Sequence, residues 1–98
     1  MKVLIQDELK SYMHEHNHNI ISLRLIHSDY NGSNIHEYRP SINYHEPADM
    51  DDFDEYDVDE FKVFVDKHVT PTNDTIEFTH DKLMGINFCN VEGVNLTM

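Results

Sequence analysis

The sequence is most strand-like at Phe61-Lys62-Val63-Phe64-Val65, a short run of aromatic and β-branched residues. Such side chains fit a pleated, half-buried sheet better than they fit a helix. Successive side chains of a strand point to opposite faces, so Phe61, Val63 and Val65 share one face. This stretch therefore predicts a strand, and it indicates a fold built on β-sheet.

Apolar runs on both sides of this stretch predict further strands. Residues 20–26 alternate, with Ile21, Leu23 and Leu25 on one face, which predicts a strand with one buried face. Shorter strands are predicted at residues 3–5, 42–45, 76–78, 86–89 and 94–96. The turn signals between the strands are Asn31-Gly32-Ser33-Asn34, Pro40, Thr70-Pro71-Thr72-Asn73-Asp74, Gly85 and Gly93.

One helix is predicted near the start of the chain. Residues that fit its buried face recur there at three- and four-residue spacing: Leu9, Tyr12, Met13 and His16. We expect Asp7 to be the N-cap, because its carboxylate can accept a free N–H of the first turn. The helix is predicted to span residues 7–16 and to end in the polar stretch that follows.

These elements predict an α+β, mainly β fold of short mixed strands with one N-terminal helix. The length of 98 residues suits one domain, which we expect to span residues 1–98. The start of the chain turns polar too soon for a signal peptide, and no apolar run approaches the roughly 20 residues of a membrane helix. A cytoplasmic location is therefore expected.

The charge balance is strongly acidic, with 19 acidic and 7 basic residues and a formal net charge of −12. Nucleic-acid binding depends on neutralising phosphates with Lys and Arg, so this balance argues against a nucleic-acid partner. An anionic membrane surface is disfavoured for the same reason. Attraction of a cation, binding of a basic protein partner, or solubility alone remain as explanations.

Much of the negative charge lies in residues 46–60, a segment without Lys or Arg. Because Phe53, Tyr56 and Val58 interrupt the charge, we expect a docked surface segment. Crowded carboxylates repel one another, so some of them should ionise reluctantly in the folded protein. An EF-hand is rejected, because Phe53 and Asp54 would occupy the fifth and sixth positions of the loop. The residues predicted to contact a basic partner are Asp49, Asp51, Asp52, Asp54 and Glu55.

Three histidines, His14, His16 and His18, lie near the predicted end of the helix and form a candidate metal site. His14 and His18 are four residues apart, the spacing of helical zinc pairs, although the HExxH pattern is absent. The alternative is that histidines at a helix C-terminus suit the helix dipole and stay solvated.

Cys89 is the only cysteine, which excludes an intramolecular disulfide and a set of thiolate ligands from one chain. A catalytic thiol would need a nearby base and a lowered pKa. The apolar context Ile86-Asn87-Phe88-Cys89 favours a small buried strand residue instead. Since no phosphate loop, GxSxG turn or paired-carboxylate signature is present, we predict no catalytic residues and no enzymatic activity.

Taken in order, the elements resemble a HesB-like domain, the fold of A-type iron–sulfur cluster assembly proteins. The best local match is Tyr56-Asp57-Val58-Asp59-Glu60-Phe61-Lys62-Val63-Phe64-Val65-Asp66, where a strand ends in Val-Asp. Other stretches that resemble the family are Met1-Lys2-Val3-Leu4-Ile5, Ile20-Ile21-Ser22-Leu23-Arg24-Leu25 and Thr75-Ile76-Glu77-Phe78. The resemblance implies a HesB-like pseudo-barrel or sandwich.

The chain departs from that family at the cysteines. A-type proteins place one cysteine after the early strand and a Cys-x-Cys pair near the C-terminus, and related small proteins carry a Cys-Cys or selenocysteine element at the first position. The corresponding stretches here, His27-Ser28-Asp29-Tyr30-Asn31-Gly32-Ser33 and Val94-Asn95-Leu96-Thr97-Met98, contain no cysteine. No cluster ligand carries over, so no bound cofactor is predicted.

The resemblance therefore implies a non-enzymatic relative of iron–sulfur cluster biosynthesis proteins that acts by binding, as a monomer or homodimer. Two alternatives stay open. One is a metal-binding protein that uses histidines and carboxylates. The other is a small acidic interaction domain that docks a basic partner through residues 46–60.

Overall fold

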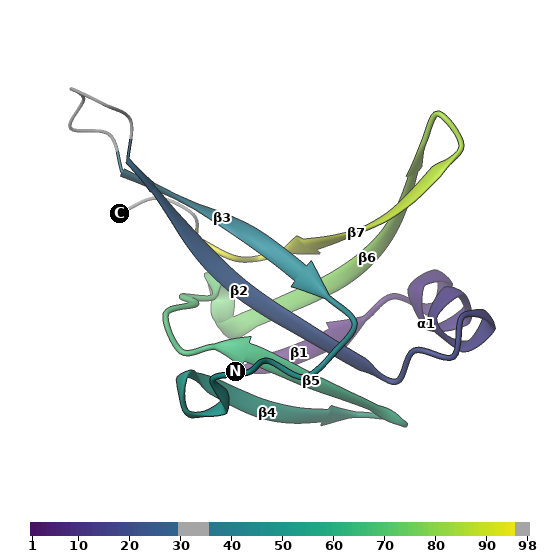
Figure 1. Cartoon of the computed structure of the whole chain (residues 1–98), viewed down its shortest axis with the longest axis horizontal. Helices are drawn as coiled ribbons and strands as arrows, with labels where there is room; N and C mark the ends of the chain where they lie inside the picture. Colours follow the sequence, from purple (N-terminus) through teal and green to yellow (C-terminus); the bar gives the residue numbers. More distant parts are fainter. Residues whose placement is uncertain (30–35, 96–98) are drawn as a thin grey trace.

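The computed structural model describes residues 1–29 and 36–95 (Figure 1). Within these residues the chain forms one α-helix, two short 3₁₀ turns and two β-sheets, which confirms the α+β class. The elements, in chain order, are β1 (Lys2–Ile5), α1 (Asp7–Glu15), β2 (Ile20–Asp29), β3 (His36–Asn43), η1 (Met50–Asp52), β4 (Phe53–Val58), β5 (Phe61–Asp66), η2 (Thr72–Asp74), β6 (Thr75–Leu83) and β7 (Ile86–Glu92).

The larger sheet has the strand order β3-β2-β5-β4, with β5 in its interior. β5 pairs parallel to β2 on one side and antiparallel to β4 on the other. The predicted strand and its buried residues Phe61, Val63 and Val65 are confirmed. Phe64 on the opposite face of β5 is buried as well. An interior strand covered on both faces accounts for this continuous burial.

The smaller sheet has the order β1-β6-β7, with β1 parallel to β6 and a β6–β7 hairpin. The predicted strands at residues 76–78 and 86–89 are therefore present and longer than expected. The hairpin turn consists of Met84 and Gly85, both with positive φ, as a two-residue primed turn requires. This turn extends the pairing to Leu83 and Ile86.

Helix α1 closes one end of the core and follows its prediction closely. Leu9 and Met13 are fully buried and contact residues of both sheets in one core cluster. The N-cap prediction is wrong by one residue, because Gln6 holds the N-cap position and Asp7 begins the helix. The carboxylate of Asp7 then lies in the first turn, where the helix dipole favours negative charge.

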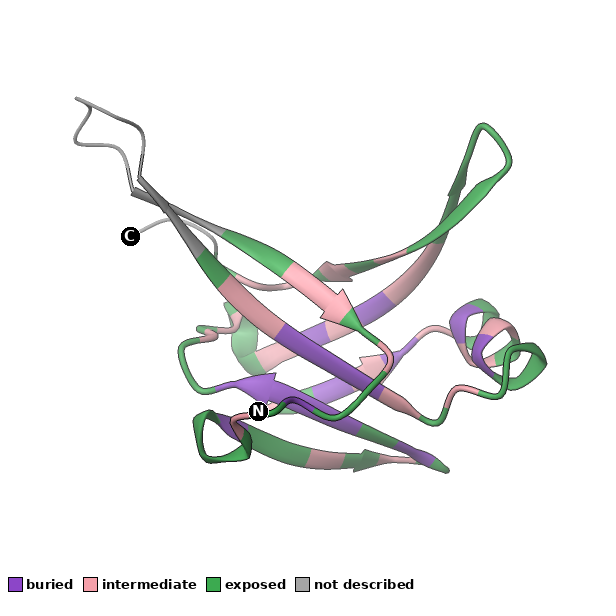
Figure 2. Ribbon diagram, viewed as in Figure 1, coloured by how far each residue is buried: buried purple, intermediate pink, exposed green. Residues whose placement is uncertain are grey.

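The core lies between the two sheets, where Figure 2 shows buried residues along β5, β1 and the middle of β2. The segment of residues 46–60 is docked against this body as expected, since Phe53 of β4 is buried. Within the same segment, residues 50–52 form the exposed turn η1. The predicted turn at residues 31–34 and residues 96–98 lie outside the described residues.

Two turn and strand predictions between β2 and β4 are wrong. Pro40 does not end a strand, because it lies within β3 opposite Leu25. β3 is an edge strand, and an edge position tolerates a residue that has no N–H to donate. The strand predicted at residues 42–45 accordingly begins earlier and ends at Asn43.

Gly93 follows the last residue of β7, and its lack of a side chain lets the backbone pass close to Thr75 at the start of β6. Its φ is +88°, and a Cβ there would lie 2.3 Å from the carbonyl oxygen of Thr75. Of the strand predicted at residues 94–96, Val94 forms a single bridge with Pro71, and residue 96 lies outside the described residues.

Candidate binding surface

A hollow of about 340 Å³ lies between the two sheets, next to helix α1. Its lining residues are Tyr12, Pro40, Ile42, Tyr44, Asn87, Phe88, Cys89, Asn90 and Val91. One wall comes from β3 and the other from β7, each of which is the edge strand of its sheet. The hollow is therefore bounded by two strand edges, and its volume falls in the range of small-ligand and peptide pockets.

Tyr12 and Tyr44 line the end of the hollow nearest to α1, and two histidine rings stack on them. Tyr12 lies at the centre of this group, with ring centroids 5.0 Å from His80 and 6.4 Å from Tyr44. His18 stacks on the other side of Tyr44 at 4.4 Å. These contacts join the helix to β6 and to the residue after β3, so the rings fix the shape of the hollow.

Cys89 faces this group from the middle of β7. It is partly buried, it lies opposite His80 in the β6–β7 register, and its thiol donates a hydrogen bond to the backbone carbonyl oxygen of Asn90 at 3.7 Å, while Tyr44 lines the same hollow. Burial raises the pKa of the Cys89 thiol to about 12, although the Tyr44 contact acts in the opposite direction. The thiol is therefore protonated at neutral pH, as suits a strand residue and not a nucleophile.

His80 supports this site from behind Tyr12 and was not singled out by the sequence. Its ring stacks on Tyr12, and its Nε2 is buried without a hydrogen-bond partner among the described residues. The sequence offered one signal, since a tight turn at Gly85 would place residues 80 and 89 opposite each other. To use that signal one must know that β6 continues to Leu83, whereas the apolar pattern predicts a strand only at residues 76–78.

The structure separates the three histidines of the candidate metal site. His14 contacts the carboxylate of Glu60 in the β4–β5 turn, while the His16 ring lies against Tyr12, with the centroids 4.3 Å apart and the planes tilted by 40°. His18 stacks on Tyr44, and its centroid is 6.2 Å from that of His16. In the part of the chain that the structure describes, no three His, Cys, Asp or Glu side chains are grouped to hold a metal ion.

The acidic segment is partly neutralised by cations from other strands. Arg24 of β2 donates two hydrogen bonds to Asp49, one of them at 3.2 Å, and its guanidinium lies 5.0 Å from the Phe53 ring centre. Lys62 of β5 donates to Glu55 at 2.9 Å. The hydrogen bond from Arg24 holds the pKa of Asp49 below its ordinary value. Asp49 is therefore not one of the carboxylates that ionise reluctantly.

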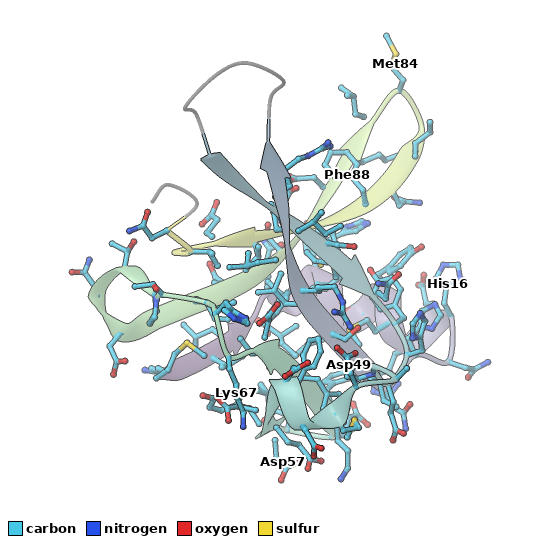
Figure 3. The ribbon with its side chains drawn as sticks, turned by 60° about the vertical axis from the view of Figure 1, so that its left-hand side comes forward. His16, Asp49, Asp57, Lys67, Met84 and Phe88 are labelled. Carbon is cyan, nitrogen blue, oxygen red and sulfur yellow. The ribbon has the colours of Figure 1, made fainter. Side chains whose placement is uncertain are left out.

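The three remaining predicted partner residues, Asp51, Asp52 and Asp54, are exposed on η1 and β4. The five residues therefore divide into two that pair within the chain and three that face solvent. Figure 3 shows Asp49 and Asp57 on the side of the molecule away from Met84 at the tip of the β6–β7 hairpin.

A family model matches residues 1–94, nearly the whole chain, and its description is CC/Se motif containing family. The chain belongs to the CC/Se motif containing family. No curated protein and no solved structure matches it. No helix in the described residues is long and apolar enough to cross a membrane.

The CC/Se motif containing family is described by a motif that this member cannot form from cysteines. Its one cysteine, Cys89, has Phe88 and Asn90 as neighbours, so no Cys-Cys pair is present. The chain thus combines membership of the family with the absence of the cysteine pair, and its hollow holds a single protonated thiol.

Proposed function

We propose that this protein is a non-enzymatic HesB-like protein that acts by binding a partner and does not itself hold an iron–sulfur cluster. The observation that carries the proposal is the state of Cys89. The only thiol is partly buried beside Tyr44, with a pKa of about 12. Ligation and nucleophilic attack both require the thiolate, which this site disfavours.

The number of thiols supports the same conclusion. Protein iron–sulfur clusters are held mainly by Cys thiolates, commonly four of them. This chain supplies one, and a symmetric dimer would supply two. His80 lies beside Cys89, but no third His, Cys, Asp or Glu joins them in the described part of the chain.

The HesB-like relationship rests on the order of elements and on residues 56–66. A parallel β2–β5 pair, an N-terminal helix and a mixed set of short strands accord with that resemblance. The family places its functional cysteines at positions where this chain has none, so the proposal assigns binding and not cluster transfer.

Anaerobic reconstitution with iron and sulfide tests the proposal. We expect no visible absorbance in the purified wild-type protein, and the same result for the Cys89→Ser control. Absorbance that appears in the wild type and disappears in Cys89→Ser would show a cluster held by Cys89 and would refute the proposal.

A second candidate is docking of a basic partner through residues 46–60, which the exposure of Asp51, Asp52 and Asp54 favours. The test is binding of an octalysine peptide to the Asp51→Asn, Asp52→Asn, Asp54→Asn triple variant at two salt concentrations. The control is a variant of equal net charge with Glu8→Gln, Glu15→Gln and Asp74→Asn, three exposed acids outside residues 46–60 and outside the β6–β7 hairpin. Equal weakening in both variants would show that only net charge matters.

A further inference from the structure

Four of the six large apolar side chains that are exposed in the described residues lie on the β6–β7 hairpin, and three of these four are the most exposed of the six. The exposed fractions are 64% for Leu83, 94% for Met84, 68% for Ile86 and 39% for Phe88. Figure 1 shows the hairpin projecting beyond the two sheets, and Figure 3 shows Met84 at its tip with Phe88 further down the strand. Contiguous exposed apolar side chains mark interaction sites more often than scattered ones do.

Three of these side chains lie on the same face of the hairpin. Leu83 pairs with Ile86 across the two strands, so their side chains point to one side. Phe88 lies two residues beyond Ile86 and therefore points to that side as well. The opposite face carries His80 and Cys89, which pack toward Tyr12 and Tyr44.

The backbone edge of β7 is also open. β7 ends the order β1-β6-β7, and within the described residues no strand pairs with its outer edge. Natural edge strands are commonly protected by Lys, Pro or inward-pointing charges. Residues 83–91 contain no Asp, Glu, Lys, Arg or Pro, and this is the longest stretch of the chain without a charged residue. An unprotected edge with an apolar face is suited to accept an additional strand.

Charge decides which occupant fits this edge. The acidic residues bordering the uncharged stretch are Glu77, Asp81 and Glu92, against one cation, Lys82. A second copy carries the same net charge of −12 over its whole chain, and the repulsion between two acidic molecules opposes self-association. A partner segment with Lys or Arg on either side of an apolar centre would meet complementary charge.

We propose that the β6–β7 hairpin docks an extended segment of a partner protein, which adds to β7 as a strand and carries apolar residues flanked by Lys or Arg. The segment's backbone pairs with the outer edge of β7. Its apolar side chains cover Leu83, Ile86 and Phe88 on one face, and on the other face they enter the hollow beside Cys89. This inference rests on the proposed binding function and names its surface and the chemistry of its partner.

Three synthetic nonapeptides test the proposal. The first has an alternating Val-Thr centre of five residues with two basic residues at each end. The second has Glu in place of the basic residues, and the third is the basic peptide N-methylated throughout its centre, which removes strand pairing. Fluorescence anisotropy at low and high salt gives the dissociation constants.

We expect the basic peptide to bind at least about tenfold more tightly than either of the others, because both charge and strand pairing contribute. The difference in dissociation constant between the basic and the acidic peptide should become smaller at high salt, because salt screens the charges. The double variant Leu83→Thr, Ile86→Thr should lose about tenfold in affinity. Ile26→Thr is the matched control, since Ile26 is an exposed strand isoleucine elsewhere in the molecule, and it should bind normally.

Three outcomes overturn the proposal. The first is a basic peptide that binds no more tightly than about 1 mM. The second is equal binding of the N-methylated or acidic peptide. The third is sedimentation showing a micromolar homodimer that Leu83→Thr, Ile86→Thr dissociates, because the edge would then be covered by a second copy. None of these outcomes produces the visible absorbance that would refute the proposed function, so the two failures are distinguishable.

Discussion

The carboxylate of Asp66 accepts a hydrogen bond from the backbone N–H of Leu25 at 3.0 Å. The parallel ladder between β2 and β5 reaches the pair Leu23 and Val65, so this side chain continues the connection where the backbones separate. The second carboxylate oxygen accepts the backbone N–H of His68 at 3.0 Å and contacts the His68 ring at 2.8 Å. Asp66 thereby connects two strands and the turn after β5.

Asp66→Asn should destabilise the protein at neutral pH and much less at low pH. Burial alone would raise the pKa of Asp66, but the hydrogen bonds from His68 and Leu25 together hold it below its ordinary value. A depressed folded pKa gives stability above the unfolded pKa, near 3.8, and loses it as pH falls through the folded pKa. We expect a loss of about 1–3 kcal/mol at pH 7. Urea unfolding at pH 7 and pH 3 measures it, and an equal loss at both would contradict the assignment.

The Arg24 and Asp49 contact gives a prediction about titration. Because the hydrogen bond from Arg24 lowers the pKa of Asp49, Arg24→Gln should raise that pKa toward 3.8. Carbon-detected NMR of the Asp49 carboxyl group follows the titration directly. Lys62→Gln is the control, because Lys62 donates to Glu55 and should leave the Asp49 titration unchanged. A normal Asp49 pKa in the wild type would remove the basis of the prediction.

Cys89 should react slowly with alkylating agents in the folded protein. With a pKa of about 12, the thiol holds roughly a thousandfold less thiolate at pH 7.5 than an ordinary cysteine does. Mass spectrometry after iodoacetamide treatment, in buffer and in concentrated urea, compares the two states. A native rate within about tenfold of the unfolded rate would show that the sulfur is an accessible thiolate.

The two glycines that flank β7 should differ in their tolerance of alanine. Both have positive φ, but a Cβ at Gly85 would meet nothing within 4 Å. Gly85→Ala should therefore cost only the backbone term of about 1–2 kcal/mol. Gly93→Ala adds a clash with the Thr75 carbonyl oxygen, and overpacking costs about 1–3 kcal/mol more. Chemical denaturation of the two variants ranks them, and equal losses would contradict the close approach at Gly93.

The spacing of apolar residues predicted the elements whose own sequence carries a helical or an alternating pattern. Leu9 and Met13 repeat at helical spacing, and Phe61, Val63 and Val65 alternate, so both segments could be placed from the sequence. Pro40 and the second half of β6 could not, because their strand structure comes from pairing with β2 and β7. Pairing partners stabilise residues whose own composition does not favour a strand.

The site was less predictable than the fold. The sequence identified Cys89 as a strand residue, which the structure confirms, but not the neighbours Tyr44 and His80. Asp49 seemed uncompensated because its cation, Arg24, is distant in sequence and reaches it only through the fold. Contacts between distant elements decide the chemistry here, and composition alone does not indicate them.

The pairing of β1 with β6 has a consequence for folding during synthesis. Val3, near the N-terminus, lies beside Ile76 in a parallel pair, and both contribute to the core. During synthesis the first strand must remain without its partner until most of the chain has left the ribosome. Distant pairings of this kind slow folding and leave apolar segments exposed meanwhile. The apolar residues of β1 therefore stay without their β6 partners until residues 75–78 have been synthesised.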